Sequence, residues 1–501
     1  MKNKVTFINI ISNMLKQIMT IITGFLIPRL ILSYFGSEVN GLISSITQFL
    51  NYITLIEGGI TGVVTASLYK PLIEKDYDKV SSIYKTAQAF YKKISIIIVL
   101  YTISLSILYP LFFNNSFSFL YVSLLVIILA VSLFNQYAFC FSYRSLFVAD
   151  KKGYIESFTK CIISLLTIIL SFVSLKIFPS IHILKLISGL LYLIQPIVYI
   201  YFSKKYYKLD KKAKIDNQLI KNRWNGFAVN IAYFIHVSTD IVILTIFTDL
   251  KLVSIYSVYN LVAIGLTYLL NSISTALNPT LGQSYAKRDF LTLNNKMDQY
   301  EIVMFFMTFF EFSIGALLVT PFVMIYTSGV NDINYYQPVF GVLLLISQGL
   351  DYIITPHTGL AHAANKYKEM TIPSYIEAII NIVLSLILVK PLGLIGITIG
   401  TIAGMLYRMG FHVWLTSNVL IKDRSQWNFY KKMIIFILST AIGVIICKFA
   451  IPNVNNEIID WVWHALVYAI IFGILYLLSV MIFFKKELNN IIMYFFSRNK
   501  S

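Results

Sequence analysis

Long apolar runs separated by short polar segments dominate this sequence. A helix that crosses the hydrocarbon core of a bilayer needs about 20 mainly apolar residues. Fourteen such runs follow one another, at 6–31, 41–67, 94–113, 119–142, 160–178, 182–202, 225–248, 252–282, 302–327, 338–362, 372–390, 393–416, 433–451 and 462–484. The pattern predicts an all-α polytopic membrane protein with about 14 transmembrane helices.

Composition and charge support this prediction. Hydrophobic residues make up 57% of the chain and charged residues only 13%, too few to cover a soluble protein of 501 residues. With a cytoplasmic N-terminus, 33 of the 41 Lys and Arg residues fall in inside segments and five at outside ends. This bias follows the positive-inside rule. We therefore expect a multi-pass protein of the inner membrane with both termini cytoplasmic, and the net charge of +18 requires no nucleic acid.

The order of the runs predicts two lobes. A basic loop separates spans six and seven, and an offset of 212 residues pairs Asn13 with Asn225 and Ser45 with Ser257. Such a repeat predicts two six-helix lobes in a pseudo-twofold arrangement around a central cavity. The expected divisions are an N-terminal lobe at 1–203, a basic cytoplasmic linker at 204–224, a C-terminal lobe at 225–416, and two additional helices with a cytoplasmic tail at 417–501.

Several spans carry polar residues on one face. A polar side chain that faces lipid is costly, so such residues face neighbouring helices or a wet cavity. At about 100° per residue, the stripes are Asn9, Asn13, Lys16, Gln17 and Thr20 on span one; Asn225, Tyr233, His236 and Asp240 on span seven; Gln348, Asp351, Tyr352, Thr355 and His362 on span ten; and Ser374, Glu377, Asn381 and Ser385 on span eleven. The alternative for the neutral residues is interhelical hydrogen bonding that only stabilises the bundle.

The buried charges are divided unevenly between the lobes. We expect the first-lobe cations to meet an anionic substrate group, because Arg and Lys both bind phosphate, and the second-lobe carboxylates to carry a coupling proton or sodium ion. Lys16 is placed about ten residues inside span one, too deep to snorkel easily. The candidate substrate-binding residues are Lys16, Arg29, Asn13, Gln17, Gln48, Asn225 and Asn230. The candidate ion-coupling residues are Asp240, Glu57, Asp351, Glu377 and His236.

No motif in the sequence indicates an enzyme or a resident cofactor. No phosphate-loop motif occurs, the six histidines show no metal spacing, and the three cysteines lie far apart in apolar runs. Asp76-Tyr77-Asp78 matches a bare DxD pattern, but it lies in a short Lys-rich segment without a nucleotide-binding domain. We expect neither catalysis nor a bound cofactor or metal.

Five further segments form a recognisable set: Ile27-Pro-Arg-Leu-Ile-Leu-Ser-Tyr-Phe-Gly36, Val39-Asn-Gly-Leu42, Gln48, Glu57-Gly-Gly59 and Gly393-Leu-Ile-Gly-Ile-Thr-Ile-Gly400. They resemble the polysaccharide transporter branch (Wzx-type flippases) of the multidrug/oligosaccharidyl-lipid/polysaccharide exporter superfamily. The resemblance implies alternating access by two bundles. It also implies a lipid-linked glycan substrate, an undecaprenyl-pyrophosphate-linked oligosaccharide flipped outward for O-antigen, capsule or exopolysaccharide synthesis.

The same resemblance implies contacts with membrane lipids, coupling to H+ or Na+, and other polysaccharide-assembly proteins as partners. Relatives often have a cationic cavity, whereas the mid-membrane charges here sum to about −2, three cations against five carboxylates. The alternatives are a lipid II flippase of the same superfamily, a cation-coupled multidrug exporter, and, in a different class, a membrane polysaccharide polymerase or ligase.

Overall fold

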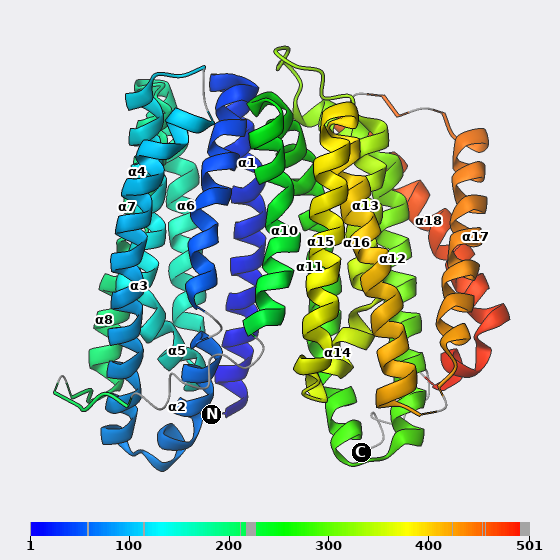
Figure 1. The fold of residues 1–501 in the computed structure, drawn as a ribbon, viewed down its shortest axis with the longest axis horizontal. Helices are drawn as coiled ribbons and strands as arrows, with labels where there is room; N and C mark the ends of the chain where they lie inside the picture. Colours follow the sequence, from blue (N-terminus) through cyan, green and yellow to red (C-terminus); the bar gives the residue numbers. More distant parts are fainter. Residues whose placement is uncertain are drawn as a thin grey trace. The chain divides into compact units, whose positions relative to one another are not determined.

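The computed structural model is all-helical (Figure 1). It describes residues 2–57, 60–113, 116–210, 212–216, 227–422, 424–452, 454–455 and 457–490, without the side chains of 2–4, 227–233 and 235–237. The chain divides into two compact units, Met1–Phe234 and Ile235–Ser501, so that the division falls inside one helix. The four-part division expected from the sequence stays a prediction.

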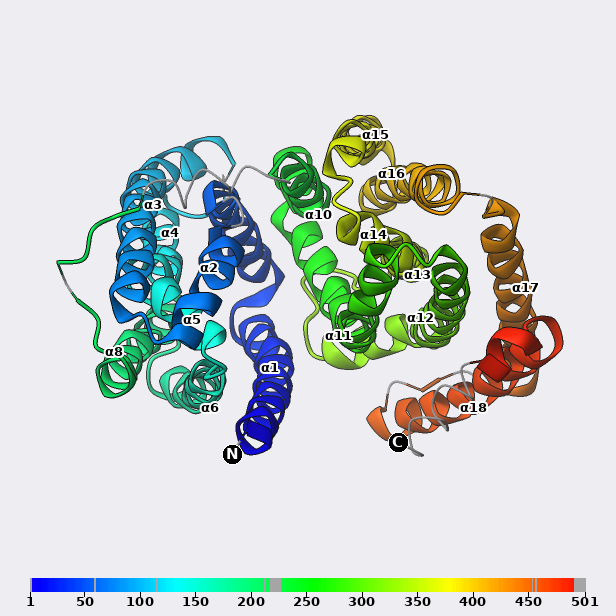
Figure 2. The same cartoon turned by 90° about the horizontal axis from the view of Figure 1, so that it is seen from below.

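The first unit is built from short and long helices in antiparallel succession (Figures 1 and 2). Its elements are α1 (Lys2–Asn51), η1 (Tyr52–Glu57), α2 (Ile60–Glu74), α3 (Tyr77–Phe112), α4 (Phe119–Asn135), the π-helix η2 (Gln136–Cys140), α5 (Phe141–Ala149), α6 (Tyr154–Ile177), α7 (Ile181–Leu191) and α8 (Ile194–Tyr206). Helix α1 packs along α6, and α4 packs between α3 and α7. A core that includes Val64, Ile83, Phe147 and Tyr199 joins α2, α3, α5 and α8.

The second unit is also built from helices. Its elements are α10 (Phe227–Phe247), which starts in the first unit, α11 (Leu250–Ala286), α12 (Phe290–Tyr326), α13 (Pro338–Ile353), α14 (Thr355–Ala363), α15 (Tyr367–Leu392), α16 (Leu394–Leu415), the π-helix η4 (Thr416–Leu420), α17 (Gln426–Ala450) and α18 (Ile458–Phe483). Helix α12 contacts α11, α13, α17 and α18. Phe305, Phe436 and Phe472 form part of the core that holds the last two helices to this unit.

The expected number of spans is confirmed. Twelve helical segments of the described residues are long and apolar enough to cross a membrane. The first of them, Val5–Glu57, contains Gly36, where φ is 80° and ψ −179°, so the chain reverses there and the segment forms two spans. Helix α10, of which the span search covers only Ser238–Phe247, is the fourteenth.

The helices extend beyond the expected spans at the basic segments. Lys70–Lys93 and Lys287–Lys296, expected as inside segments between spans, are mostly helical. Helices α3 and α12 have 36 and 37 residues, or about 54 Å at 1.5 Å per residue, which exceeds the roughly 30 Å hydrocarbon core. Their basic ends therefore extend past the hydrocarbon as helix, because solvated lysines do not interrupt a helix.

Four turns support the internal repeat. The non-glycine residues with positive φ among the described residues are Lys75, Lys151, Arg288 and Asn365, all between 56° and 58°. Lys75 and Arg288 each precede an aspartate that caps the next helix, Asp76 on α3 and Asp289 on α12. The offsets are 213 residues for the first pair and 214 for the second pair, close to the expected 212.

The second pair of turns matches in its hydrogen bonds as well. The amide of Lys152 donates to the carbonyl of Phe147 at 2.7 Å, and the amide of Lys366 donates to that of Ala361 at 3.0 Å. A left-handed residue after the last helical turn satisfies the free carbonyls there. The same type of helix-ending turn at matching positions of both units indicates a parallel repeat, as expected from the sequence.

Glycines allow close packing of helix α16 against helix α15. A Cβ atom at Gly400 would lie 2.3 Å from the Ser385 Oγ and 2.9 Å from the Asn381 carbonyl oxygen. A Cβ at Gly396 would lie 2.2 Å from the Leu388 carbonyl oxygen. These glycines belong to the Gly393–Gly400 segment singled out in the sequence, and they permit backbone contact as small residues do in membrane helix pairs.

We expect Gly400→Ala to destabilise the protein by about 1–3 kcal/mol, because the added methyl overpacks a rigid backbone contact. The matched control is Gly410→Ala on the same helix, where a Cβ would have nothing within 4 Å. Thermal unfolding of both variants in detergent measures the difference. Equal melting temperatures for the two variants would contradict the close contact between α15 and α16.

Candidate functional site

A buried carboxylate in the first unit gathers basic side chains. Glu156 on α6 has 5% of its side chain exposed and accepts from the Arg144 Nε at 3.0 Å, and its other carboxylate oxygen lies 2.8 Å from the Lys160 Nζ. Lys16 on α1 interacts electrostatically with Glu156. Three cations around one carboxylate leave a local charge of about +2. The sequence analysis missed Glu156, although its i, i+4 spacing to Lys160 signalled an ion pair.

Hydrogen bonds between α1 and α6 fix the position of Lys16. The Asn9 side chain donates to the Lys151 carbonyl at 2.6 Å and accepts from the Tyr154 amide at 2.7 Å. Asn13 accepts from the Ser157 hydroxyl at 2.9 Å. Asn9 is therefore level with the α5–α6 turn, and Lys16 lies seven residues further, about 10 Å along the helix. Lys16 lies eleven residues after Val5, where the apolar helical segment begins, and its expected depth in the membrane stays a prediction.

The other first-unit candidates lie apart from this cluster. Arg29 is part-buried on the same part of α1, thirteen residues after Lys16, or about 20 Å of helix. One phosphate cannot touch both residues at once. Gln17 and Gln48 are part-buried. Glu57 in η1 accepts from the hydroxyls of Thr61 and Tyr137, the latter at 3.1 Å, so neutral donors hold it.

In the second unit, Asp240 joins several helices. This residue of α10 is 5% exposed and accepts from the Tyr256 hydroxyl of α11 at 3.0 Å and the Thr401 hydroxyl of α16 at 3.2 Å. Asn381 of α15 donates to the Thr401 hydroxyl at 3.5 Å. The carboxylate of Asp240 and the hydroxyls of Tyr256 and Thr401, from three helices, form an oxygen-rich group of the kind that hard cations prefer.

Two other candidate carboxylates share one arginine. The Arg408 Nη1 of α16 lies 3.3 Å from the Asp351 Oδ1 of α13 and 3.6 Å from the Glu377 Oε1 of α15. Their side chains are 15%, 23% and 6% exposed, respectively. The local charge is about −1. The candidate residues from the sequence did not include Arg408, which the fold pairs with both acids.

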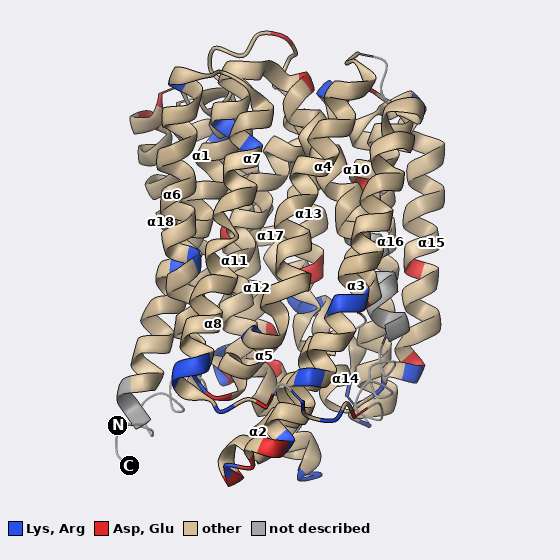
Figure 3. Cartoon of the chain, turned by 90° about the vertical axis from the view of Figure 1, so that its left-hand side faces the viewer, with Lys and Arg blue, Asp and Glu red and all other residues tan. Residues whose placement is uncertain are grey.

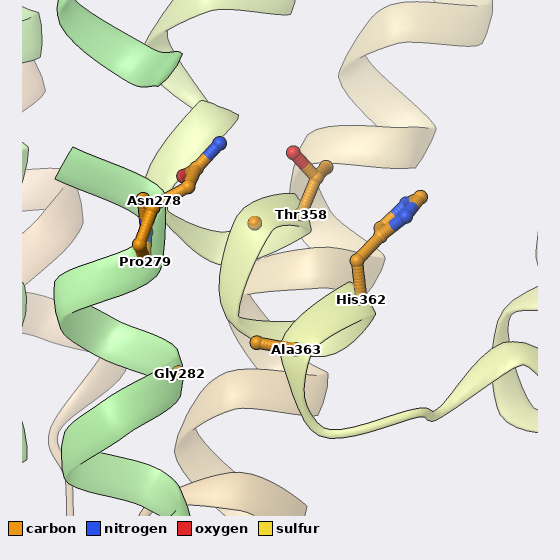
Figure 4. Close-up of a pocket in the computed structure, with 7 residues that line it drawn as sticks. Asn278, Pro279, Gly282, Thr358, His362 and Ala363 are labelled. Atoms are coloured by element: carbon orange, nitrogen blue, oxygen red, sulfur yellow. The ribbon is translucent and has the colours of Figure 1, made fainter. Parts of the chain in front are cut away.

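A pocket of about 420 Å³ lies near this ion cluster, between α11 and α14. Figure 4 shows the Asn278 side chain of α11 and the Thr358 side chain of α14 pointing toward one another. His362, also in the lining, interacts electrostatically with Arg408. Gly359 and Gly282 allow the two helices that bound the pocket to approach each other closely. A Cβ at Gly359 would lie 2.2 Å from the Asn278 Oδ1.

Glu311 of α12 is the remaining mid-span acid. Both of its carboxylate oxygens are buried, and neither has a hydrogen-bond partner among the described residues. It interacts electrostatically with Tyr352, whose hydroxyl accepts from the Asn271 amide at 2.8 Å. The sequence analysis counted this charge without including it among the candidate ion-coupling residues.

Three candidates on span seven cannot be placed. Asn225 lies outside the described residues, and so do the side chains of Asn230 and His236. Within the described part of the chain, no group of three or more His, Cys, Asp and Glu residues could hold a metal ion.

Comparison with solved structures identifies the fold. Lipid II flippase MurJ in an inward closed conformation matches 96% of this chain and 100% of its own, with a TM-score of 0.71 and 15% identity. An inward-facing multidrug resistance MATE family transporter of the MOP superfamily matches 82% of this chain and 99% of its own, with a TM-score of 0.59 and 13% identity. The MATE multidrug transporter DinF-BH matches 85% of this chain and 96% of its own, with a TM-score of 0.62 and 15% identity.

No protein-family model and no curated protein match the sequence. At 13–15% identity, the structural likeness shows the fold alone. The chain is therefore a multi-pass membrane protein with the fold of MurJ and of the MATE transporters.

Proposed function

We propose that the protein is a flippase that moves an undecaprenyl-pyrophosphate-linked oligosaccharide from the cytoplasmic to the outer leaflet by alternating access. The observation that carries the proposal is the positive charge around Glu156. The Arg144 side chain is 40% exposed and that of Lys160 is 30% exposed, so both can reach a ligand while paired with Glu156. A pyrophosphate carries several negative charges and suits the planar fork of an arginine together with lysine point charges.

The predicted orientation supports this assignment. The cluster lies near the α5–α6 turn, at the end of the unit with the basic segments, which the positive-inside rule places in the cytoplasm. A cytoplasmic cation cluster would receive the pyrophosphate where a lipid-linked precursor is made. Lys16 is suited to contact the ligand, because among the described residues no hydrogen bond to Glu156 holds its amine.

The second unit contains the proposed binding site for the coupling ion. Asp240, with Tyr256 and Thr401, offers oxygen ligands from three helices, and a bound Na+ or H+ would change how tightly these helices hold together. Asp351 and Glu377 are further ion-coupling candidates, with one shared positive charge from Arg408. Ion binding that favours one packing of these helices over another would couple the gradient to transport.

Lys16→Gln is the direct test of the substrate site, with Arg29→Gln beside it and Lys176→Gln as the control on α6. The host gene is deleted, and surface glycan and accumulated lipid-linked glycan are measured in cells expressing each variant. We expect Lys16→Gln to lower export roughly 10- to 100-fold, the equivalent of a charge-assisted hydrogen bond of about 1.5–3 kcal/mol. Normal export by Lys16→Gln would overturn the proposed site, and no accumulation after deletion would overturn the flippase function.

A second candidate function is a cation-coupled multidrug exporter. The excess negative charge of Asp351 and Glu377 over Arg408, close to the 420 Å³ pocket, suits an organic cation. Gradient-driven transport of a cationic dye by the purified protein in vesicles separates the two functions. Dye transport with unchanged glycan export in the deletion strain would favour the exporter.

A further inference from the structure

A second pocket lies on α3, away from the charge clusters described above. It measures about 700 Å³ and is bounded by α3, by the α4–η2 segment and by one residue of the chain after α8. Pockets of 300–1,000 Å³ are typical of small-molecule and lipid sites. Its lining residues come from the first unit alone, so the pocket is complete within that unit.

One face of α3 changes from basic to apolar along this pocket. Lys85, Gln88 and Lys92 follow one another at i, i+3 and i+7, and Val99 and Leu100 continue the same face. Leu100 is 61% exposed. Figure 3 shows the basic residues on the lower part of α3, below a stretch without charge.

The opposite wall is apolar and has an unusual backbone. Phe134, Ala138 and Phe139 line it, and the last two belong to the π-helix η2. A π-helical turn is wider than an α-helical turn and often marks a functional position. The small Ala138 leaves depth in the wall, and Phe139 is 50% exposed beside it.

The segment after α8 closes the basic end of the pocket. Ile215 lines it. The Ser82 hydroxyl of α3 donates to the Lys214 carbonyl at 2.7 Å, and the amide of Asp216 donates to the Thr86 hydroxyl at 2.8 Å. These bonds hold Ile215 over the groove, so the pocket is built from three segments of the chain.

The charges of the lining are uniformly positive. Lys85 and Lys92 are the ionisable residues among the described side chains that line it. Within the described part of the chain, the ammonium group of neither lysine forms an ion pair or a hydrogen bond. Two unpaired ammonium groups at one end and an exposed apolar groove at the other end match a molecule with a phosphate head and a hydrocarbon tail.

We propose that this pocket binds an anionic phospholipid of the adjacent leaflet, with its phosphate on Lys85 and Lys92 and an acyl chain along Val99, Leu100 and Phe139. Lysines at a helix end near the headgroups bind acidic lipids in this way, while their stems cover apolar surface. The site is independent of the transported substrate, and occupancy would also hold Ile215 and its neighbours against α3.

The test uses the full chain with Phe139→Trp as a local reporter, reconstituted with brominated phosphatidylglycerol or brominated phosphatidylcholine. Quenching of the five native tryptophans, measured on the parent, is subtracted. Each lysine near an anionic headgroup contributes about a fivefold preference. We expect stronger quenching by phosphatidylglycerol, and we expect Lys85→Gln with Lys92→Gln to lower that preference roughly tenfold or more. Lys93→Gln is the matched control, because Lys93 is exposed beside Lys92 and does not line the pocket.

Equal quenching of the reporter by the two lipids would overturn the proposal, and so would a preference that survives in the double variant. Displacement of phosphatidylglycerol by an undecaprenyl-pyrophosphate lipid but not by phosphatidylcholine would also overturn it, since the pocket would then belong to the substrate. Native mass spectrometry of the unlabelled protein gives a second readout without the tryptophan. Retained phosphatidylglycerol on the parent and its loss from the double variant support the site.

Discussion

Replacing Asp240 by asparagine is expected to remove the ion dependence of transport. The substitution keeps the size of the side chain and its acceptor for Tyr256 and Thr401, but it removes the negative charge that would hold a cation or a proton. Coupling between two ligands is typically worth 1–3 kcal/mol, or about 5- to 150-fold. We therefore expect gradient-driven transport by Asp240→Asn in vesicles to fall by a factor in this range.

Two further variants sharpen this experiment. Asp332→Asn removes an exposed acid from the segment between α12 and α13 and serves as the control for lost negative charge. Thr401→Val removes a neutral oxygen, which a sodium ion needs as a ligand and a proton does not. If Asp240→Asn transports like the parent under both Na+ and H+ gradients, Asp240 has only a structural role.

Replacing Glu301 by glutamine is expected to cause the largest loss of stability. Glu301 of α12 is fully buried and lies 2.7 Å from the Arg424 Nη2, 2.6 Å from the Lys432 Nζ and 3.1 Å from the His357 Nε2. Asp298 is the other acid of the cluster. Removing one partner of a buried ion pair costs about 3–5 kcal/mol, because the remaining charges stay buried without compensation.

The control for Glu301→Gln is Glu369→Gln. Glu369 also pairs with a lysine, Lys366, but the two side chains are 40% and 28% exposed, and exposed ion pairs contribute only about 0–1 kcal/mol. Thermal unfolding of both variants in one detergent gives the comparison. Similar melting temperatures would mean that the Glu301 cluster does not fix α17 to α12.

Local features of the fold could be predicted from the sequence because each depends on a short stretch of chain. Apolar runs of about 20 residues identified the fourteen spans, since only helices satisfy their backbone groups in lipid. Asp76 and Asp289, which follow spans two and eight, cap helices in the structure, although no cap was predicted for them. The glycines of 393–400 were noted only for a family resemblance, and the structure shows that they allow α16 to pack closely on α15.

Partnerships between distant residues could not be predicted in this way. Lys432 was counted as a basic residue of an inside segment, but it is 2% exposed and paired with Glu301, 131 residues away. Asp351, Glu377 and Arg408 were found as separate charges, and the packing of α13, α15 and α16 joins them. Periodicity gives the face of a helix that carries a charge, but not the helix that this face meets.

The sequence by itself determined that this chain spans a membrane many times as helices, and it predicted a repeat of its two halves. The tertiary structure alone decided which charges share a site, which carboxylate Lys16 lies near and which basic residues are buried. The physical reason is that the transfer of a segment into lipid depends on its own composition, whereas the free energy of a buried charge depends on the partner within about 4 Å that neutralises it.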